Sequence, residues 1–294
     1  MSQEKEAKED QPIYDPQRKE EIEKIKARMQ EQIKIQDAMK KIRHKIAIMS
    51  GKGGVGKTTV AVNLAVTLHL RKFRVGLLDL DMTGPDVPLM LGMEDTVLET
   101  DGISILPALW GQGLKVISLE FLLEKKDTPV IWRGPVKAGA MKQFITEVSW
   151  GELDYLIMDL PPGTSDEPLT MAQIMPDADG TLIVTTPQDV SILDVSKCIN
   201  FARTLKLPVI GIIENMSGLI CPYCKNSIPL FGSGGGEGAS KKYGIPLLGK
   251  IPIDPVIVTS GDQGKPFVVS HPDSPASKAF EGIVTHLIKI LENQ

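Results

Sequence analysis

The chain has 294 residues, enough for one large α/β domain, and its 42% hydrophobic and 24% charged residues are typical of a globular protein. A net charge of −4 gives no overall attraction to nucleic acid or to an anionic membrane, and no apolar run reaches the roughly 18 residues of a membrane span. The three cysteines, Cys198, Cys221 and Cys224, do not form the even set of a secreted disulfide framework. Because the N-terminus is charged and lacks an apolar signal core, we expect a cytoplasmic protein without nucleic-acid or membrane partners.

Residues 1–44 form a charged extension, and residues 45–294 are predicted to form a single domain. Positions 1–17 have the composition of a disordered segment. Over 18–41, apolar residues recur at helical spacing, at Ile22, Ile25, Met29, Ile33 and Met39. We interpret this part as an amphipathic helix lying on the surface of the domain, with an arm that binds a partner as the alternative.

From residue 45 onward, strand-like and helix-like runs alternate. Continuous Val, Ile and Leu runs predict strands at 45–49, 74–80, 154–160, 180–186, 209–215 and 247–251. Helices are predicted at 59–71, 137–147, 166–175, 190–205, 236–243 and 276–292. This alternation predicts a doubly wound α/β domain with a mostly parallel sheet covered on both faces. Residues 95–135 fit no such unit, and we expect a β-hairpin insertion there that contributes to a dimer surface.

The phosphate-loop pattern G-x-x-x-x-G-K-S/T is matched in full by Gly51, Lys52, Gly53, Gly54, Val55, Gly56, Lys57 and Thr58, with Thr59 next in the chain. Glycines let backbone N–H groups converge on phosphate oxygens, and the helix that follows directs its N-terminal donors at the same anion. Lys57 is predicted to hold the β- and γ-phosphates of ATP, and Thr58 to ligate Mg²⁺.

A second lysine, Lys52, lies inside the loop, where phosphate binding alone does not require it. It is either an exposed loop residue or a cation directed at the nucleotide of a second subunit. With Lys52 in place, the loop resembles the deviant phosphate loop of the MinD/ParA/nitrogenase-iron-protein superfamily. That resemblance implies a P-loop ATPase in which Lys52 is catalytic across a homodimer.

Three carboxylates follow two of the predicted strands. Asp79 and Asp81 end the second strand, and Asp159 ends the strand 154–160 as a Walker B acid. Carboxylates at the carboxyl ends of parallel strands face the ligand crevice, where they can hold Mg²⁺ or orient an attacking water. By resemblance, Asp81 positions the water and Asp79 joins Asp159 around the metal. Gly163 follows in a Pro-Pro-Gly turn and is predicted to donate its N–H to the γ-phosphate.

Three residues are assigned to the nucleoside by resemblance to the same superfamily. Asn215, at the end of the strand 209–215, corresponds to an asparagine that contacts the base. Pro252 and Asp254 lie in a segment that resembles the loop closing over the adenosine. Ordinary turn chemistry is the alternative for these positions, because Asn and Asp are common in turns.

Cys221 and Cys224 form a Cys-Pro-Tyr-Cys pair in a predicted loop after Asn215. A zinc site or an iron–sulfur cluster commonly needs four ligands, and Cys198 lies in a predicted helix, where a small buried side chain is the simplest interpretation. A two-fold dimer would supply four thiolates. The spacing itself leaves iron and zinc open.

The phosphate-loop variant, the 159–166 segment and the 214–224 segment together resemble the Mrp/ApbC family of iron–sulfur cluster carrier ATPases over about residues 44–292. The resemblance implies that Cys221 and Cys224 of two chains hold a 4Fe–4S cluster that passes to apo-proteins. We expect slow ATP hydrolysis, since its product would be a conformational change. A positioning ATPase switch of the MinD/ParA kind and a zinc-bridged dimer are the alternatives. Neither the recipient proteins nor the step that ATP drives follows from the sequence.

Overall fold

A computed structural model describes residues 16–81, 84, 86–122, 134–163, 166–221, 223, 224 and 226–293. In this part of the chain, one eight-stranded sheet forms the centre, in the order β12-β9-β8-β1-β7-β2-β6-β5. Its strands pair in parallel except β5, which runs antiparallel to β6 at one edge. The strands are β1 (Ile42–Met49), β2 (Val75–Asp79), β5 (Ala108–Trp110), β6 (Leu114–Ser118), β7 (Leu153–Asp159), β8 (Gly180–Thr185), β9 (Val209–Glu214) and β12 (Leu247–Lys250).

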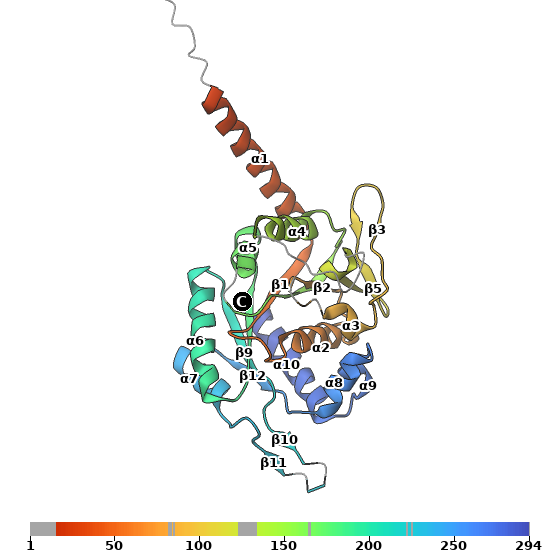
Figure 1. The fold of residues 1–294 in the computed structure, drawn as a ribbon, viewed down its shortest axis with the longest axis vertical. Coiled ribbons are helices and arrows are strands. Elements are labelled where there is room, and N and C mark those ends of the chain that lie inside the picture. The colour runs from red at the N-terminus through yellow and green to blue at the C-terminus, as the bar shows by residue number, and fades with distance from the viewer. Residues whose placement is uncertain are drawn as a thin grey trace, which may run out of the picture.

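Helices cover both faces of this sheet (Figure 1). One layer contains α2 (Lys57–Leu70), α3 (Val87–Leu91), α8 (Pro255–Asp262), α9 (Phe267–Ser270) and α10 (Pro275–Glu292). The other contains the end of α1 (Pro16–Met39), α4 (Gly134–Thr146), α5 (Asp166–Ile174), α6 (Asp189–Thr204) and α7 (Gly235–Tyr243). The predicted doubly wound fold is therefore confirmed.

The central strand β1 shows why the sheet forms. Ile46 and Ile48 pack into one hydrophobic layer, while Ala47 and Met49 pack into the other, because side chains alternate along a strand. All four are fully or almost fully buried. Burial of each large apolar side chain contributes about 1.5–3 kcal/mol, so a strand that is apolar on both sides is strongly held at the centre. Its carboxyl end leads directly into the phosphate loop.

Helix α1 does not lie on the domain as the sequence led us to expect. Only its last turns are packed, through the buried Ile35 and Met39, whereas Ile22 and Met29 are 44% and 59% exposed. In Figure 1 the helix projects away from the sheet. Helical periodicity reveals an apolar face without showing what covers it, and here the body of the protein covers only the end.

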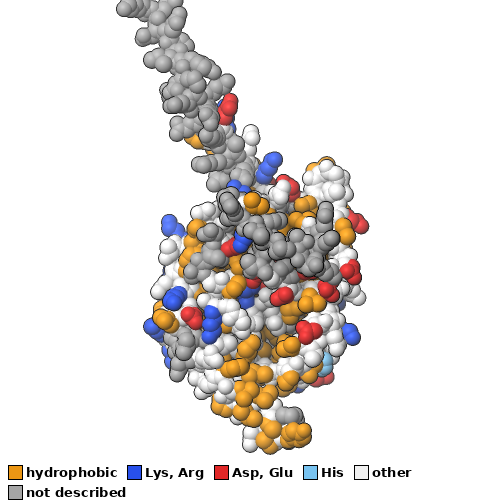
Figure 2. All heavy atoms as spheres, in the orientation of Figure 1, with side chains coloured by type: hydrophobic (Ala, Val, Ile, Leu, Met, Phe, Trp, Pro, Cys, Tyr) orange, Lys and Arg blue, Asp and Glu red, His pale blue; other side chains and the backbone are white. Residues whose placement is uncertain are grey.

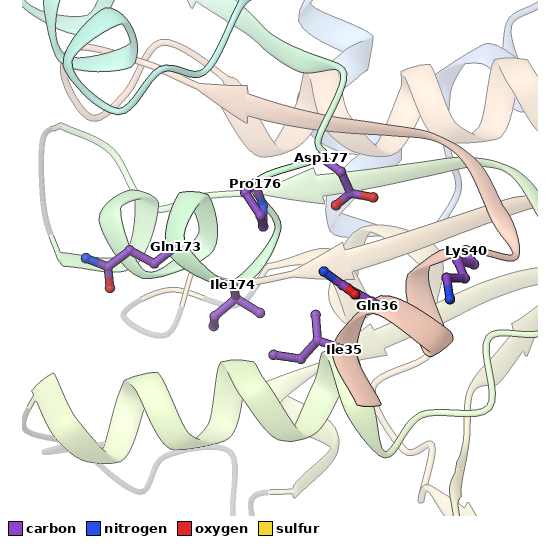
Figure 3. Close-up of a pocket in the computed structure, with 7 residues that line it drawn as sticks. All are labelled: Ile35, Gln36, Lys40, Gln173, Ile174, Pro176 and Asp177. Atoms are coloured by element: carbon purple, nitrogen blue, oxygen red, sulfur yellow. The ribbon is translucent and has the colours of Figure 1, made fainter. Parts of the chain in front are cut away.

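A cavity of about 280 Å³ lies where the end of α1 meets the end of α5. Figure 3 shows its apolar side chains, Ile35, Ile174 and Pro176, beside the polar Lys40 and Asp177. This cavity is remote from the phosphate loop, since it lies at the end of the sheet where β1 begins.

Two small hairpins complete the described part of the chain. β3 (Glu99–Thr100) pairs with β4 (Ile105–Leu106), which confirms β structure in the predicted insertion, and η1 (Leu119–Leu122) follows β6. Residues 123–133 lie outside the described residues. β10 (Leu219–Ile220) pairs with β11 (Ser227–Ile228) and carries the cysteine pair at the end of the molecule opposite α1 (Figure 1). Every described helix is too short or too polar to cross a membrane.

Candidate functional site

The phosphate loop connects the end of β1 to the start of α2, as predicted. Gly54 and Gly56 have φ values of 76° and 77°, in the left-handed region that favours glycine. Gly51 has no room for a side chain, because a Cβ there would lie 2.3 Å from the carbonyl oxygen of Asp194 in α6. The loop borders a cavity of about 310 Å³, which Asp81, Gly84, Asp86, Met90 and Pro162 also line.

Lys57 lies between two of the predicted carboxylates. Its buried ammonium group is 2.6 Å from Asp159 Oδ1 and 3.6 Å from Asp81 Oδ2. Thr58 Oγ1 is 3.5 Å from the same Nζ atom. The carboxyl ends of β2 and β7 are neighbours in the sheet, so residues far apart in sequence meet here. In this arrangement the phosphate-loop lysine neutralises the carboxylates.

Asp79 lies deeper, beneath this group. Its Oδ2 accepts a hydrogen bond from Ser118 Oγ at 2.9 Å, and its Oδ1 accepts one from the backbone N–H of Asp81 at 3.1 Å. Complete burial raises the pKa of Asp79 well above its ordinary value, and the negative charge of Asp159 raises it further.

Asp159 is also completely buried. Burial raises the pKa of this carboxyl, although the Lys57 ammonium opposes the shift. Its second oxygen, Oδ2, is buried without a hydrogen-bond partner among the described residues. Oxygen ligands of this kind are what Mg²⁺ prefers, so Asp159, with Thr58 and Asp79 beside it, fits a divalent cation.

Lys52 extends along the same loop. Its Nζ donates a hydrogen bond to Gln188 Oε1 at 3.4 Å, at the start of α6, and its backbone carbonyl accepts one from Ser50 Oγ. The side chain is thus held against its own chain in this structure. A reach toward a second subunit stays a prediction.

Gly163 is the residue predicted to sense the γ-phosphate. Its N–H donates to the backbone carbonyl of Ser50 at 2.8 Å, and its φ of 86° again requires glycine. The donor is therefore occupied by the phosphate loop itself, and it would have to be released before it could bind a phosphate oxygen. Thr164 and Ser165, which follow, lie outside the described residues.

The residues predicted to contact the nucleoside have structural contacts of their own. Asn215 is buried at the end of β9, and its Nδ2 donates to the backbone carbonyl of Val55 at 2.9 Å. Asp254 is the N-cap of α8, where its carboxylate accepts a hydrogen bond from the N–H of Val256. Pro252 is half-buried two residues earlier. Contact of these side chains with adenosine stays a prediction.

Sequence reasoning missed Asp86 and Gln188. Asp86 borders the phosphate cavity, and burial raises its pKa, as does the charge of Asp81. Its position five residues after Asp81, just beyond a Gly-Pro pair, was the available signal. Gln188 had no signal in the sequence, since only the tertiary fold brings it to Lys52.

The cysteine pair is separate from this cavity. Cys221 is half-buried, Cys224 is exposed, and neither forms a disulfide. The backbone N–H of Cys221 donates to the carbonyl of Asn226 across the hairpin at 2.9 Å. Among the described residues, no three His, Cys, Asp or Glu side chains cluster as a metal site. Cys198, by contrast, is fully buried, and burial raises its pKa to about 12.

Comparisons with known proteins bear on both features. A sequence model of the ParA family, described as NUBPL iron-transfer P-loop NTPase, matches residues 41–288. An iron-sulfur cluster carrier protein of Methanocaldococcus jannaschii is 50% identical over 265 residues, which cover 90% of this chain and 91% of the relative. One from Saccharolobus solfataricus is 48% identical over 261 residues, covering 89% and 88%.

Solved structures give the same architecture. A nucleotide-binding protein from Archaeoglobus fulgidus in complex with ADP has a TM-score of 0.74 and 38% identity, covering 85% of this chain and 96% of that one. The septum site-determining protein MinD of Pyrococcus horikoshii, complexed with Mg-ADP, has a TM-score of 0.59 and 25% identity, covering 85% and 97%. The predicted P-loop NTPase fold of the MinD/ParA type is thus confirmed.

Proposed function

Because the chain belongs to the ParA family, and within it to the NUBPL iron-transfer P-loop NTPases, we propose that it binds an iron–sulfur cluster between two copies and delivers it to apo-proteins under the control of ATP. The observation that carries the proposal is the exposed Cys221–Cys224 hairpin on a complete P-loop NTPase. The names of relatives at 46–50% identity support the same cargo.

The nucleotide side of the function depends on charge. The backbone of the phosphate loop and Lys57 hold the phosphates of ATP, and Lys57 would leave Asp159 to do so. Asp79, Asp159 and Thr58 would hold Mg²⁺, which supplies charge neutralisation on the phosphates when bound. Asp81 orients the attacking water, and Lys52 of the partner chain stabilises charge on the transferred phosphoryl group.

The cargo side of the function needs two chains. A 4Fe–4S cluster commonly takes four thiolates, and each chain offers two that are accessible. The surface around the pair is apolar, with exposed side chains at Ile220, Tyr223, Ile228, Leu230 and Phe231. Figure 2 shows hydrophobic side chains gathered at this end of the molecule. Such a patch supports burial against a second copy.

We also place the protein in the cytosol. The proposed cluster needs thiolates, and reducing compartments keep cysteines reduced. A zinc-bridged dimer is the competing use of the same four thiols, since the Cys-x-x-Cys spacing does not choose the metal.

Anaerobic reconstitution with iron and sulfide tests the proposal. We expect about four irons for every two chains, in a dimer that separates when the cluster is removed. Cys221→Ser and Cys224→Ser should lose the iron and the dimer together. The matched control is Cys198→Ser, which removes a buried thiol and should retain the cluster. Equal iron in the Cys221→Ser protein, or zinc bound with no iron, would overturn the cluster assignment.

A further inference from the structure

A short segment of the chain connects the phosphate loop with the cysteine hairpin. Asn215 Nδ2 donates to the carbonyl oxygen of Val55, within the loop, at 2.9 Å. A carbonyl oxygen only accepts, so the amide nitrogen must face it. The contact is close, because a Cβ on Gly56 would lie 2.3 Å from that nitrogen and 3.8 Å from Met216 Cε. The loop and residues 215–216 thus touch directly.

The next residues are held up to the hairpin by backbone hydrogen bonds to the segment 251–253. The N–H of Ser217 donates to the carbonyl of Ile251 at 2.8 Å, and the carbonyl of Gly218 accepts from the N–H of Ile253 at 2.7 Å. Strand β10 begins at Leu219, and Cys221 follows it. Met216 is a non-glycine residue at φ 57°, a conformation that persists only where the surroundings fix it.

A buried carboxylate anchors the same segment from below. Glu214 is fully buried, its Oε1 accepts from Ser217 Oγ at 2.6 Å, and its Oε2 accepts from the N–H of Gly236 at 2.7 Å. Both ends of the segment and its middle are therefore fixed to the body. Because these hydrogen bonds restrict independent motion of residues 215–218, a displacement at Val55 is passed on to Cys221.

We propose that Asn215 is a positioning residue that couples the state of the phosphate loop to the geometry and accessibility of the Cys221–Cys224 pair. Phosphate binding draws the backbone N–H groups of the loop toward the anion, so the peptide carbonyls between them, including that of Val55, must reorient. Asn215 transmits this change to the hairpin, which begins four residues later at Leu219. The inference deepens the proposed function, on which it rests for the role of the pair. By linkage, a metal on the thiols must alter nucleotide affinity by the same factor.

The rate of thiol alkylation tests this coupling without any iron. Reduced, metal-free protein is treated with iodoacetamide, with and without saturating Mg²⁺ and a non-hydrolysable ATP analogue, and each cysteine is read by peptide mass. Cys198 is the internal control, because it is fully buried and its raised pKa of about 12 leaves almost no thiolate. In the wild type we expect the nucleotide to change the Cys221 and Cys224 rates by about fivefold or more.

Two variants then separate coupling from binding. Asn215→Ala should reduce the nucleotide effect to less than about twofold at nucleotide concentrations shown by calorimetry to saturate the site. Ser217→Ala removes only the hydroxyl bond to Glu214, so it should weaken the effect while nucleotide affinity stays unchanged. If Asn215→Ala does not fold or does not bind nucleotide, the coupling is judged from Ser217→Ala alone.

The inference is overturned if the wild-type rates do not respond to nucleotide, or if the decisive variant keeps the full wild-type response. Failure of the proposed function would appear in a different measurement, the reconstitution with iron and sulfide. A protein that binds no cluster after reconstitution but retains the nucleotide-dependent thiol rates loses the proposed cargo and keeps the coupling.

Discussion

Replacing Asp79 by asparagine should stabilise the nucleotide-free protein. Asp79 is fully buried, and the nearest cation, Lys57, bonds to Asp159 instead. Asparagine can keep the bond from the N–H of Asp81, which its Oδ1 accepts, and can replace the bond from Ser118 by one in the opposite direction, from its Nδ2 to Ser118 Oγ. The substitution thus removes a buried charge but leaves the Ser118 hydroxyl proton without its acceptor, because Ser118 Oγ then accepts from both Nδ2 and the N–H of Glu120.

The expected gain follows from the burial of that charge. Replacing buried ion pairs by neutral side chains of similar volume stabilises proteins by up to about 1–4 kcal/mol, and we expect a gain at the lower end of this range for Asp79→Asn. For a domain of this size, each 1 kcal/mol raises Tm by about 2–4 °C. The sign of the pH dependence follows from the raised pKa of Asp79. The folded protein keeps a proton that the unfolded chain loses above about pH 4, so wild-type stability falls as pH rises through the folded pKa. Asparagine does not titrate, and its advantage should grow with pH.

Thermal unfolding in EDTA at pH 5 and pH 8 measures both quantities. The Tm difference between Asp79→Asn and wild type should be positive at pH 8 and smaller at pH 5. Asp262→Asn, at an exposed position in α8, is the matched control and should show little change at either pH. A variant that is less stable than wild type at pH 8, or an equal gain at both pH values, would refute the reasoning. With Mg²⁺ and ATP present, the variant should gain less stability than wild type.

Three other substitutions test the site. Lys52→Ala should abolish ATP turnover in the dimer and leave the affinity for ATP largely intact, and unchanged turnover would exclude the cross-subunit role. Gly51→Ala places a Cβ 2.3 Å from the carbonyl oxygen of Asp194, so α6 must shift. We expect the free energy of unfolding in urea to fall by about 1–3 kcal/mol. An unchanged free energy of unfolding would show that α6 can move without cost. Asp254→Ala removes the cap bond to Val256 N and should cost about 1 kcal/mol. If the variant loses stability but binds ATP with wild-type affinity in calorimetry, Asp254 has no part in closing over adenosine.

The central strands could be predicted because both of their faces are buried. The run Ile46–Met49 is apolar at every position, which is typical of a parallel strand buried on both faces. Strand β6 was predicted only as part of a β-hairpin insertion and not as a strand of the central sheet, since Leu114–Ser118 is short and contains a lysine. It becomes a strand by pairing with β2, which lies 39 residues earlier at the Asp79–Ser118 contact. Pairings of this kind leave little local signal.

In the candidate site, too, some contacts could be predicted from the sequence and others could not. That Lys57 and Asp159 would meet followed from the rule that parallel strands end at one edge, although 102 residues separate them. The bond from Gly163 to Ser50 and that from Asn215 to Val55 were not predicted. Backbone carbonyls look alike in every sequence, so no residue type marks them as acceptors. Contacts of this class appear only when the fold has been built.

The central place of β1 has a consequence for synthesis of the protein. Ala47 in β1 accepts a hydrogen bond from Thr181 in β8, 134 residues later. As the chain leaves the ribosome from its N-terminus, β1 emerges before β7 and β8, the two strands with which it pairs. During that interval its apolar side chains have no sheet to join, which is the condition under which nascent chains aggregate or engage chaperones. A nascent chain arrested before β8 should therefore be unable to bind ATP, although its phosphate loop is already complete.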